Sequence, residues 1–350
     1  MIEVGLIGFG LGGRCFHAPI IRAVEGLRLA AILQRSGDSA AQLYPDVRIV
    51  RTLDELLAIE SIKLISISTP NQTHFPLAKR CLEAGRHVVV DKPFTTNVPE
   101  ALELLHLAKK LGRVLSVYHN RRFDADFQAL RHTVASGVLG GIIRFESTYD
   151  RYRPTSKPGA WREQPGPGSG ILFDLAPHLI DQAFMLLGTP EAFSADIRIE
   201  RPGFRTDDAF DIFLHYTQGS RALLRATMMS ASPRPRLVLL TEKGSYLKRE
   251  FDPLEPTLRS GDIPTGPSWV VEGPENYGEV TLMENGGAVT RKIPSIGDWR
   301  EFYANVRDAI LVNAPLLVTH QQILNVVVAL ELALESNSRR AEVAWRDVQA

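Results

Sequence analysis

Asp174 and His178 are of residue types that move protons, and they stand four positions apart, so on a helix they share one face. A histidine titrates near neutral pH and can take a proton from a hydroxyl group, while a carboxylate orients it. A structural explanation exists for both residues. Asp174 is a good helix N-cap type, and His178 is of a kind often found buried and hydrogen-bonded. The pair alone leaves both interpretations open.

Lys92 lies in Asp91-Lys92-Pro93, directly after the apolar run His87–Val90. A lysine at the end of a buried strand can hydrogen-bond a reacting oxygen and favour deprotonation of an alcohol. An ordinary surface lysine is the alternative. Lys92 therefore becomes a candidate only if other residues of the same site accompany it.

A glycine-rich turn, residues 8–13, has the pattern G-x-G-x-x-G between a strand-like run and a helical segment. Glycine there allows a tight turn, close approach of the backbone to a pyrophosphate, and close packing of helix on strand. Amide groups at the helix start then face the phosphates. The alternative is a turn that serves packing alone. The turn predicts a dinucleotide site that includes Gly8, Phe9, Gly10, Leu11 and Gly13.

The choice between NAD and NADP depends on the end of the second strand, about 20 residues beyond the glycines. An acidic residue there would bind the ribose 2′-hydroxyl and repel a 2′-phosphate. The chain has Arg35 and Ser36 instead, which offer a guanidinium fork and a hydroxyl to a phosphate. Asp38 lies a little further on and argues for caution, and Arg35 as a solvated loop residue is the alternative. The sequence favours NADP.

Residues after the fourth strand are further cofactor candidates, because the carboxyl ends of parallel strands border the nucleotide crevice. Thr69, Pro70 and Asn71 are expected to flank the nicotinamide ribose. His74 is also a cofactor-binding candidate, although a role as a helix-start residue explains it better.

Composition limits the class of protein that carries these residues. The chain has 350 residues and no net charge, with 40 basic and 40 acidic side chains. It therefore gives no electrostatic reason to expect nucleic acid or an anionic membrane as a partner. Its two cysteines cannot make a disulfide framework or a cysteine metal site, so no metal is expected and a reducing cytoplasm fits. No apolar run approaches the roughly 18 residues of a membrane span.

Strands and helices alternate through residues 1–119. Nearly continuous apolar runs predict strands buried on both faces, and helical segments between them predict parallel βαβ units. The sequence therefore predicts an α/β protein with an N-terminal Rossmann dinucleotide-binding domain. The runs are Val4–Gly8, Leu29–Leu33, Leu64–Ser68, His87–Val90 and Val114–Val117.

Residues 120–350 predict a second, α+β domain with a mostly antiparallel open sheet, because turn signals separate consecutive short strands. Pro253–Gly278 is predicted to be a long loop. Two closing helices, Trp299–Val312 and Gln321–Ser336, are expected to pack partly on the first domain. The predicted strands are Ile142–Tyr149, Ala192–Glu200, Ala209–Tyr216, Arg221–Met229, Leu237–Thr241 and Ser245–Phe251, with helices at Arg122–Ser136 and Leu175–Leu187.

The order of these motifs resembles the glucose–fructose oxidoreductase/inositol dehydrogenase (Gfo/Idh/MocA) family along essentially the whole chain. Within the family the chain looks most like the NADP-dependent scyllo-inositol dehydrogenases. Two positions depart from the usual pattern. Asp91 replaces a glutamate, which alters how Lys92 is positioned without abolishing it, and Ala176 stands where glycine is common. The likeness is carried by segments 16–19, 69–71, 85–88, 91–93, 116–123, 151–154, 161–163, 174–182 and 315–316.

The resemblance implies a site and an activity. It places Lys92, Asp174 and His178 at the reacting hydroxyl, with His178 as the acid/base. The activity it implies is NADP-dependent interconversion of a cyclitol or sugar alcohol and its ketone, most simply scyllo-inositol and an inosose, in a homodimer or homotetramer. Alternatives are an aldose or keto-sugar dehydrogenase, a dihydrodiol or biliverdin-type reductase, and a non-catalytic NADP sensor on the same fold. The substrate pocket would include His119, Tyr152, Arg153 and Trp161, and the cofactor would also contact Asp91, Lys92 and Asn120.

Overall fold

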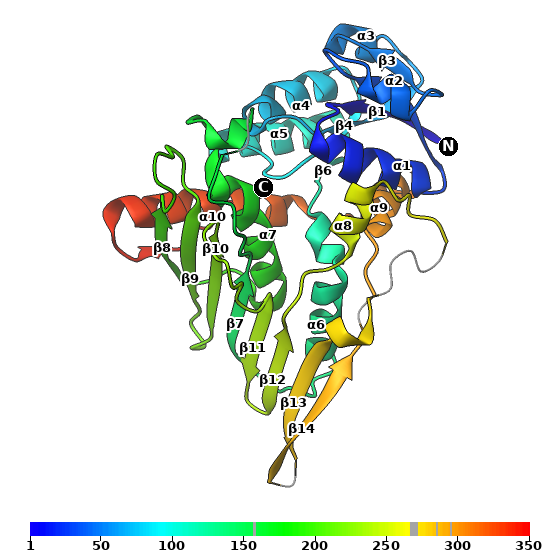
Figure 1. Ribbon diagram of the computed structural model, residues 1–350. Coiled ribbons are helices and arrows are strands. Elements are labelled where there is room, and N and C mark those ends of the chain that lie inside the picture. Colours follow the sequence, from blue (N-terminus) through cyan, green and yellow to red (C-terminus); the bar gives the residue numbers. More distant parts are fainter. Residues whose placement is uncertain (157–158, 267–271, 285, 295) are drawn as a thin grey trace.

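Two sheets with their helices make up the fold (Figure 1). A computed structural model describes residues 1–156, 159–266, 272–284, 286–294 and 296–350. The blue-to-cyan half holds a parallel sheet between helices, and the green-to-yellow half holds a larger sheet with helices on one face. This is the Rossmann half followed by a mostly antiparallel half that the sequence predicts.

The first sheet has six parallel strands in the order β3-β2-β1-β4-β5-β6. Its central strands are buried on both faces, which explains their continuous apolar sequence: Val88, Val89 and Val90 are fully buried. The short edge strand β3 was not predicted, because its three residues carry no apolar run. The strands are β1 (Ile2–Ile7), β2 (Leu27–Leu33), β3 (Arg48–Val50), β4 (Ile62–Ile67), β5 (His87–Val90) and β6 (Leu115–Val117).

Short helices connect these strands and cover both faces of the sheet. The Asn97 side chain caps the longest of them at its start by accepting from the Glu100 amide, and Gly112 ends it in the left-handed conformation. The helices are η1 (Gly13–His17), α1 (Ala18–Ala23), α2 (Ser39–Leu43), α3 (Leu53–Leu57), η2 (Asn71–Thr73), α4 (His74–Glu83) and α5 (Val98–Leu111).

The second sheet has nine strands in the order β14-β13-β12-β11-β7-β10-β9-β8-β15. Only β7 and β10 pair in parallel; every other neighbouring pair in it is antiparallel. The strands are β7 (Ile142–Thr148), β8 (Ala192–Arg198), β9 (Ala209–His215), β10 (Arg221–Thr227), β11 (Leu237–Thr241), β12 (Gly244–Lys248), β13 (Gly278–Glu284), β14 (Gly287–Ile293) and β15 (Val343–Ala344).

Helix α7 (Gly170–Leu187) packs on one face of this sheet, in contact with β7, β9 and β10. It is long and apolar enough to cross a membrane by length and composition, but 72% of it is buried inside the protein, as in a core helix. Among the residues that the structure describes, no helix covers the opposite face of this sheet.

Three details of the second half differ from the sequence prediction. Helix α7 begins at Gly170, five residues before the predicted start at Leu175. The described part of Pro253–Gly278 is not all loop, since it holds α8 (Leu254–Ser260) and η5 (Pro274–Asn276), while 267–271 lie outside the described residues. The hairpin β13–β14 was missed, because β14 is exposed along its length and lacks a buried alternation.

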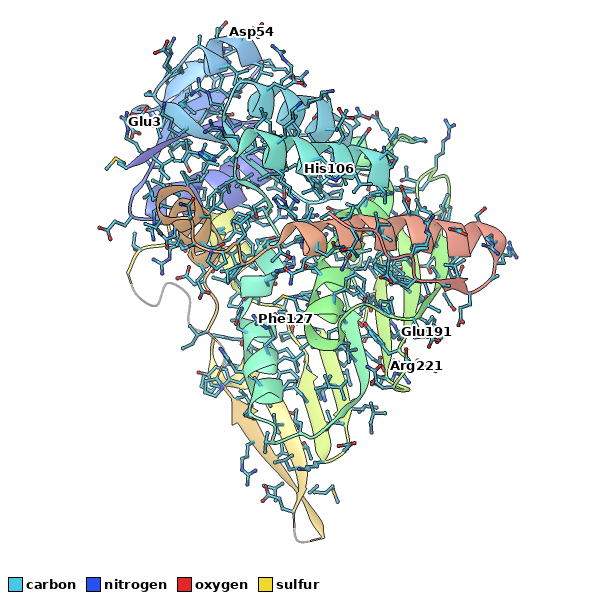
Figure 2. The ribbon with its side chains drawn as sticks, turned by 180° about the vertical axis from the view of Figure 1, so that it is seen from behind. Glu3, Asp54, His106, Phe127, Glu191 and Arg221 are labelled. Atoms are coloured by element: carbon cyan, nitrogen blue, oxygen red, sulfur yellow. The ribbon has the colours of Figure 1, made fainter. Side chains whose placement is uncertain are left out.

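The remaining helices join the two halves. Helix α9 (Arg300–Val312) contacts α1, and α10 (His320–Arg339) contacts α5 and β6 on one side and α7 and β8 on the other. Seen from behind, α10 runs across the junction, with Asp54 in one half and Arg221 in the other (Figure 2). The other helices of the second half are η3 (Asn120–Phe123), α6 (Ala125–Ala135) and η4 (Trp161–Glu163).

Candidate active site

One large cavity, about 1240 Å³, runs along the carboxyl edge of the parallel sheet and reaches the second half. Its wall begins at the glycine turn after β1 and ends at α7 and the chain that follows β7. Such an edge is where open α/β sheets bind nucleotides. The cavity holds candidates from both halves: Gly8, Phe9, Gly10, Leu11, Arg35, Ser36, Thr69, Pro70, Asp91, Lys92, Asn120, Arg153, Trp161, Asp174 and His178.

The glycine turn leaves no room for side chains where the prediction needs bare backbone. Gly8 has φ +96°, and a β-carbon there would lie 2.2 Å from the Ser68 carbonyl oxygen. A β-carbon at Gly13 would lie 2.1 Å from the Gly8 carbonyl oxygen, so Gly13 serves close packing of the helix start on the turn. Gly10 has open space above it. The turn is therefore a backbone cradle of the kind that fits a pyrophosphate.

Arg51 lies against the segment after β2, the strand end on which the predicted choice between NAD and NADP depends. Its guanidinium donates to the Asp38 carboxylate at 2.7 Å and to the carbonyl oxygens of Gln34 and Gly37 at 2.9 and 2.6 Å. The carboxylate of Asp38, the nearby acid that would oppose a 2′-phosphate, is therefore neutralised by the guanidinium of Arg51. Arg35 is exposed on the cavity wall and has no ion pair within the described ranges, so its guanidinium is available to a ligand.

Lys92 and Asp174 connect the two halves at the other end of the cavity. The Lys92 ammonium donates to the Asp174 backbone carbonyl and, at 3.1 Å, to its carboxylate Oδ1. Arg162 lies at the same oxygen, with Nε 3.1 Å away. Burial opposes ionisation of Asp174, but Lys92 and Arg162 outweigh it and hold the pKa of this carboxyl below its ordinary value. Asp174 is therefore a fixed negative charge that places the ammonium of Lys92.

His178 lies one helical turn from Asp174 on the same cavity wall. Burial lowers the pKa of His178 well below its ordinary value, and the nearby positive charges of Lys92 and Arg121 lower it further. The imidazole is therefore neutral at physiological pH and able to accept a proton. Its Nδ1 is buried and has no hydrogen-bond partner among the described residues.

Asp91 holds the segment that carries Lys92. Its carboxylate accepts from the Lys92 amide at 2.8 Å and from the Ser68 hydroxyl at 3.4 Å, and His17 Nε2 lies 3.6 Å from it. Burial raises the pKa of Asp91, yet the proximity of His17 and the charge of Lys92 bring that pKa down to about 2. The shorter acid thus still anchors the lysine through the backbone.

Asp207 holds α7 in place from the loop between β8 and β9. Its carboxylate accepts from the Leu172 amide at 2.6 Å, and its carbonyl accepts from Ile171. Asp207, and not Asp174, therefore satisfies the first turn of this helix, whose N-cap position is Ser169. The capping explanation of Asp174 is wrong, and the fixed start of α7 sets where Asp174 and His178 point.

Five predicted residues do not reach the cavity wall. Gly13 lies behind the turn, and the Asn71 side chain donates to the Gly168 carbonyl at 2.6 Å. Both ring nitrogens of His74 face carbonyl oxygens, those of Pro93 and Thr69, so His74 braces the site from behind. His119 is buried beneath the wall, and Tyr152 is 57% exposed outside it. Asp181, one turn beyond His178 on α7, also lies off the cavity wall and forms a buried ion pair with Arg122.

Sequence reasoning missed three residues of the site. Arg51 directly follows β3, so the strand-end argument would have found it if that short edge strand had been recognised. Arg121 is on the cavity wall and donates to Asp124 and Glu255, but it lies within the 3-10 helix η3, which has no sequence signature. Asp207 lies in a loop far from α7 in sequence, and only the fold brings it to the helix.

Comparison with known proteins agrees with this geometry. The family model described as "Oxidoreductase family, NAD-binding Rossmann fold" matches residues 2–119, and the "GFO/IDH/MocA C-terminal domain" matches residues 127–247. The uncharacterized oxidoreductase YdgJ of Escherichia coli (strain K12) is 43% identical over 97% of both chains. The scyllo-inositol 2-dehydrogenase (NADP(+)) IolW of Bacillus subtilis (strain 168) is 33% identical over 98% of this chain and 95% of its own. A crystal structure of an oxidoreductase from Bacillus cereus superposes with a TM-score of 0.91 at 31% identity, over the full length of both chains.

Proposed function

This chain belongs to the Gfo/Idh/MocA family of oxidoreductases with a nicotinamide dinucleotide-binding Rossmann domain, and we propose that it is an NADP(H)-dependent dehydrogenase of polyols. Its reaction interconverts a secondary alcohol of a cyclitol or sugar and the corresponding ketone. The first substrate pair to test is scyllo-inositol and an inosose. Such a reaction needs a dinucleotide cradle and an acid/base within one cavity.

The convergence of Lys92, Asp174 and His178 at one end of the cavity that starts at the glycine turn carries this proposal. Lys92 comes from the dinucleotide-binding half and the other two from α7. A non-catalytic NADP sensor would not need a neutral buried histidine, an ion-paired lysine and a carboxylate at that point. The geometry therefore favours the enzyme over the sensor.

Each of these residues has one task in the oxidative direction. When bound, NADP⁺ supplies the acceptor for the hydride that leaves the carbinol carbon. His178 takes the hydroxyl proton, which its neutral imidazole can accept. Lys92 donates a hydrogen bond to the oxygen on which negative charge develops, and Asp174 holds the ammonium there. Ketone reduction returns the proton from His178 to the oxygen.

Three residues support NADP over NAD. Arg35 and Ser36 offer a guanidinium and a hydroxyl at the cavity wall, and Arg51 removes the repulsion of Asp38. A guanidinium matches a phosphate with two parallel hydrogen bonds. A ribose 2′-phosphate would therefore find donors at this strand end, whereas the described residues there include no unpaired carboxylate to accept from the 2′-hydroxyl of NAD.

Initial rates with NADP⁺ and NAD⁺, against scyllo-inositol, myo-inositol and a panel of aldoses, test the proposal. We expect oxidation of scyllo-inositol with NADP⁺. Aldose oxidation alone would favour the keto-sugar dehydrogenase alternative. No turnover with any polyol, together with tight NADPH binding, would favour the sensor and contradict the proposal.

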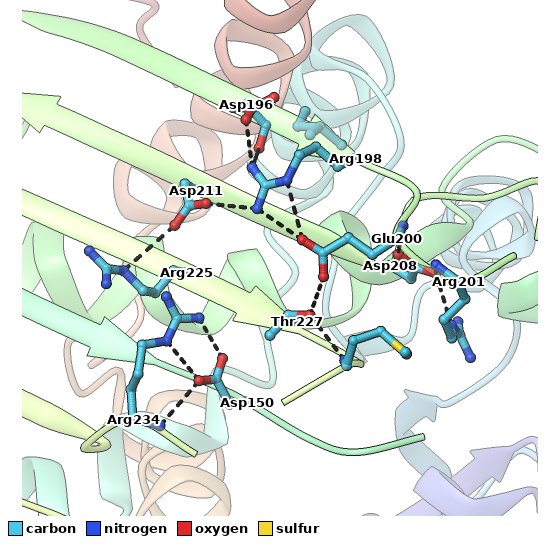
Figure 3. A network of polar contacts seen from close by, with 12 residues as sticks. Asp150, Asp196, Arg198, Glu200, Arg201, Asp208, Asp211, Arg225, Thr227 and Arg234 are labelled. Atoms are coloured by element: carbon cyan, nitrogen blue, oxygen red, sulfur yellow. Dashed lines mark hydrogen bonds and ion pairs between the residues drawn. The ribbon is translucent and has the colours of Figure 1, made fainter. Parts of the chain in front are cut away.

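We also propose that the enzyme works as a homo-oligomer in the cytoplasm, where its two buried free cysteines stay reduced. The open face of the large sheet combines a charge network (Figure 3) with apolar side chains such as Phe213 and Leu240, each 41% exposed. A second copy of the chain is the partner that would cover them. Light scattering on a sizing column measures the mass of the wild type and of Phe213→Lys. A wild-type mass of one chain, which Phe213→Lys leaves unchanged, would contradict this assembly.

A further inference from the structure

Arg151 and Arg153 lie on the cavity wall, at the end far from β2 and Arg35. Their backbone continues β7 in extended form, with the Arg151 amide bonded to Thr227 and the Arg153 amide to Met228. Side chains alternate along such a segment. Both arginines therefore face the cavity, while Tyr152 between them points outward and is 57% exposed.

The other arginines of this end of the cavity are already neutralised. Each has at least one carboxylate partner, and Glu255 serves two of them. Among the described arginines at this end of the cavity, Arg151 and Arg153 are therefore the two without a carboxylate partner. The pairs are Arg121 with Asp124 and Glu255, Arg162 with Asp174, Arg201 with Asp208 and Glu163, and Arg259 with Glu255.

No ion pair joins Arg151 or Arg153 to a carboxylate anywhere in the ranges that the structure describes. The Arg151 guanidinium lies over the Tyr149 ring, 4.7 Å from its centre, which holds it in one orientation without neutralising it. Burial lowers the pKa of Arg153, and the neighbouring charges of Arg151 and Arg259 lower it further. Asp174 and Glu255 lie close enough to act on these charges without pairing directly with either guanidinium. The wall thus carries two adjacent cations that, among the described residues, have no direct carboxylate partner.

We propose that Arg151 and Arg153 form an anion subsite, and that the preferred polyol or keto-sugar carries a carboxylate or a phosphate. This inference rests on the proposed function, since it assigns the substrate class of the same site. An anion between the two guanidinium groups would relieve their repulsion and accept charge-assisted hydrogen bonds from both. Neutral scyllo-inositol fills the cavity near Lys92 and His178 but leaves this subsite without its partner.

The test compares matched neutral and anionic substrates on the full-length enzyme. Values of kcat/KM with NADP⁺ are measured for an inositol and its monophosphate, and for glucose and its uronate. Wild type is set beside R151Q/R153Q and beside R198Q, which removes a paired arginine of the open sheet face. We expect the anionic member of at least one pair to be preferred by about tenfold to hundredfold, the range of a charged hydrogen bond.

That preference should collapse toward unity in R151Q/R153Q and persist in R198Q. The pair that shows it tells a phosphate ligand from a carboxylate. R151K/R153K keeps the charge but loses the planar fork, so an intermediate preference is expected. Equal use of neutral and anionic substrates by the wild type would overturn the inference, and so would a preference that survives in R151Q/R153Q.

Calorimetric titration of the NADPH-loaded chain separates this inference from the proposed function. If no substrate is oxidised, the proposed function fails, and titration with the inositol monophosphate and the uronate still decides on the subsite. Binding that the wild type shows and R151Q/R153Q loses would support it, and absence of binding would overturn it. Weaker NADPH binding by R151Q/R153Q, with unchanged anion binding, would assign both arginines to the cofactor and overturn it too.

Discussion

Arginines on the open sheet face and arginines at the far end of the cavity meet different surroundings. On the sheet face, Arg198 contacts Asp196, Glu200 and Asp211, and Arg234 forms a fork with Asp150 (Figure 3). In the cavity, Arg151 and Arg153 lie side by side with no acid paired to either among the described residues. The arginines of the first surface are paired directly with acids, and these two arginines of the cavity are not.

This difference separates scaffold from site. A paired surface arginine contributes between zero and about 1 kcal/mol, and the fold changes little without it. Arg151 and Arg153 have no such partner, so a bound anion would stabilise their guanidinium groups more than their present surroundings do. Substitutions in the two regions should therefore differ both in size and in which property they change.

The largest effect is expected at His178, whose replacement should abolish the acid/base step. His178→Asn keeps the size of the side chain but cannot take a proton, so kcat/KM for polyol oxidation should fall by about 10²- to 10⁴-fold. Steady-state kinetics measure this, and NADPH fluorescence checks that the cofactor still binds. A loss of less than about tenfold would remove His178 from the chemistry.

A smaller, selective effect is expected at the cofactor end. Arg35→Gln should lower kcat/KM with NADP⁺ by about tenfold to hundredfold, because one charged hydrogen bond to the 2′-phosphate is lost. Rates with NAD⁺ should not fall. Arg28→Gln, at an exposed pair with Glu3, is the matched control. Equal losses with both cofactors would show that Arg35 does not read the phosphate.

The pH profile should shift when Lys92 is replaced. Oxidation needs neutral His178, so kcat/KM falls as the pH drops below the lowered pKa of that residue. Burial and the charge of Lys92 both lower this pKa, so Lys92→Gln should raise it and move the acid limb to higher pH, on a reduced rate. An acid limb that stays in place or moves to lower pH would contradict this coupling.

The smallest effect is expected on the sheet face. Arg198→Gln removes a partly exposed network member and should lower the free energy of unfolding by no more than about 1 kcal/mol, with polyol kinetics unchanged. Thermal melting and the rate assay measure the two quantities. A large kinetic loss would show that the two regions are coupled, and the distinction between scaffold and site would then fail.

Much of the fold follows from local sequence patterns. Strands such as Val88–Val90 are apolar because both faces are buried, and the glycine turn needs residues without side chains, so both can be recognised without a structure. The exposed strand β14 and the short helix α8 carry no such pattern. Their formation depends on neighbouring strands and on the packing of α8 against η1.

The candidate site was predictable where a residue type and a strand or helix position coincide. Lys92, Asp174 and His178 meet that condition, and the structure brings all three to one wall. Tyr152 does not meet this condition. Its neighbours Arg151 and Arg153 take the inward positions of the alternating segment, so its side chain points away from the cavity. Arg51 could be found only by recognising the short edge strand β3, and the role of Asp207 cannot be deduced from spacing, since it acts on a helix distant in the chain.

Through Lys92 and Asp174, the half proposed to bind the cofactor and the half proposed to bind the substrate meet by hydrogen bonds at the site itself. Evolution or design can therefore exchange the residues beyond β7, and with them the accepted substrate, while the dinucleotide end stays intact. One condition limits such exchange: the incoming unit must present a carboxylate to the lysine. A chimera without this carboxylate would bind both cofactor and substrate, but Lys92 would not be positioned for hydride transfer between them.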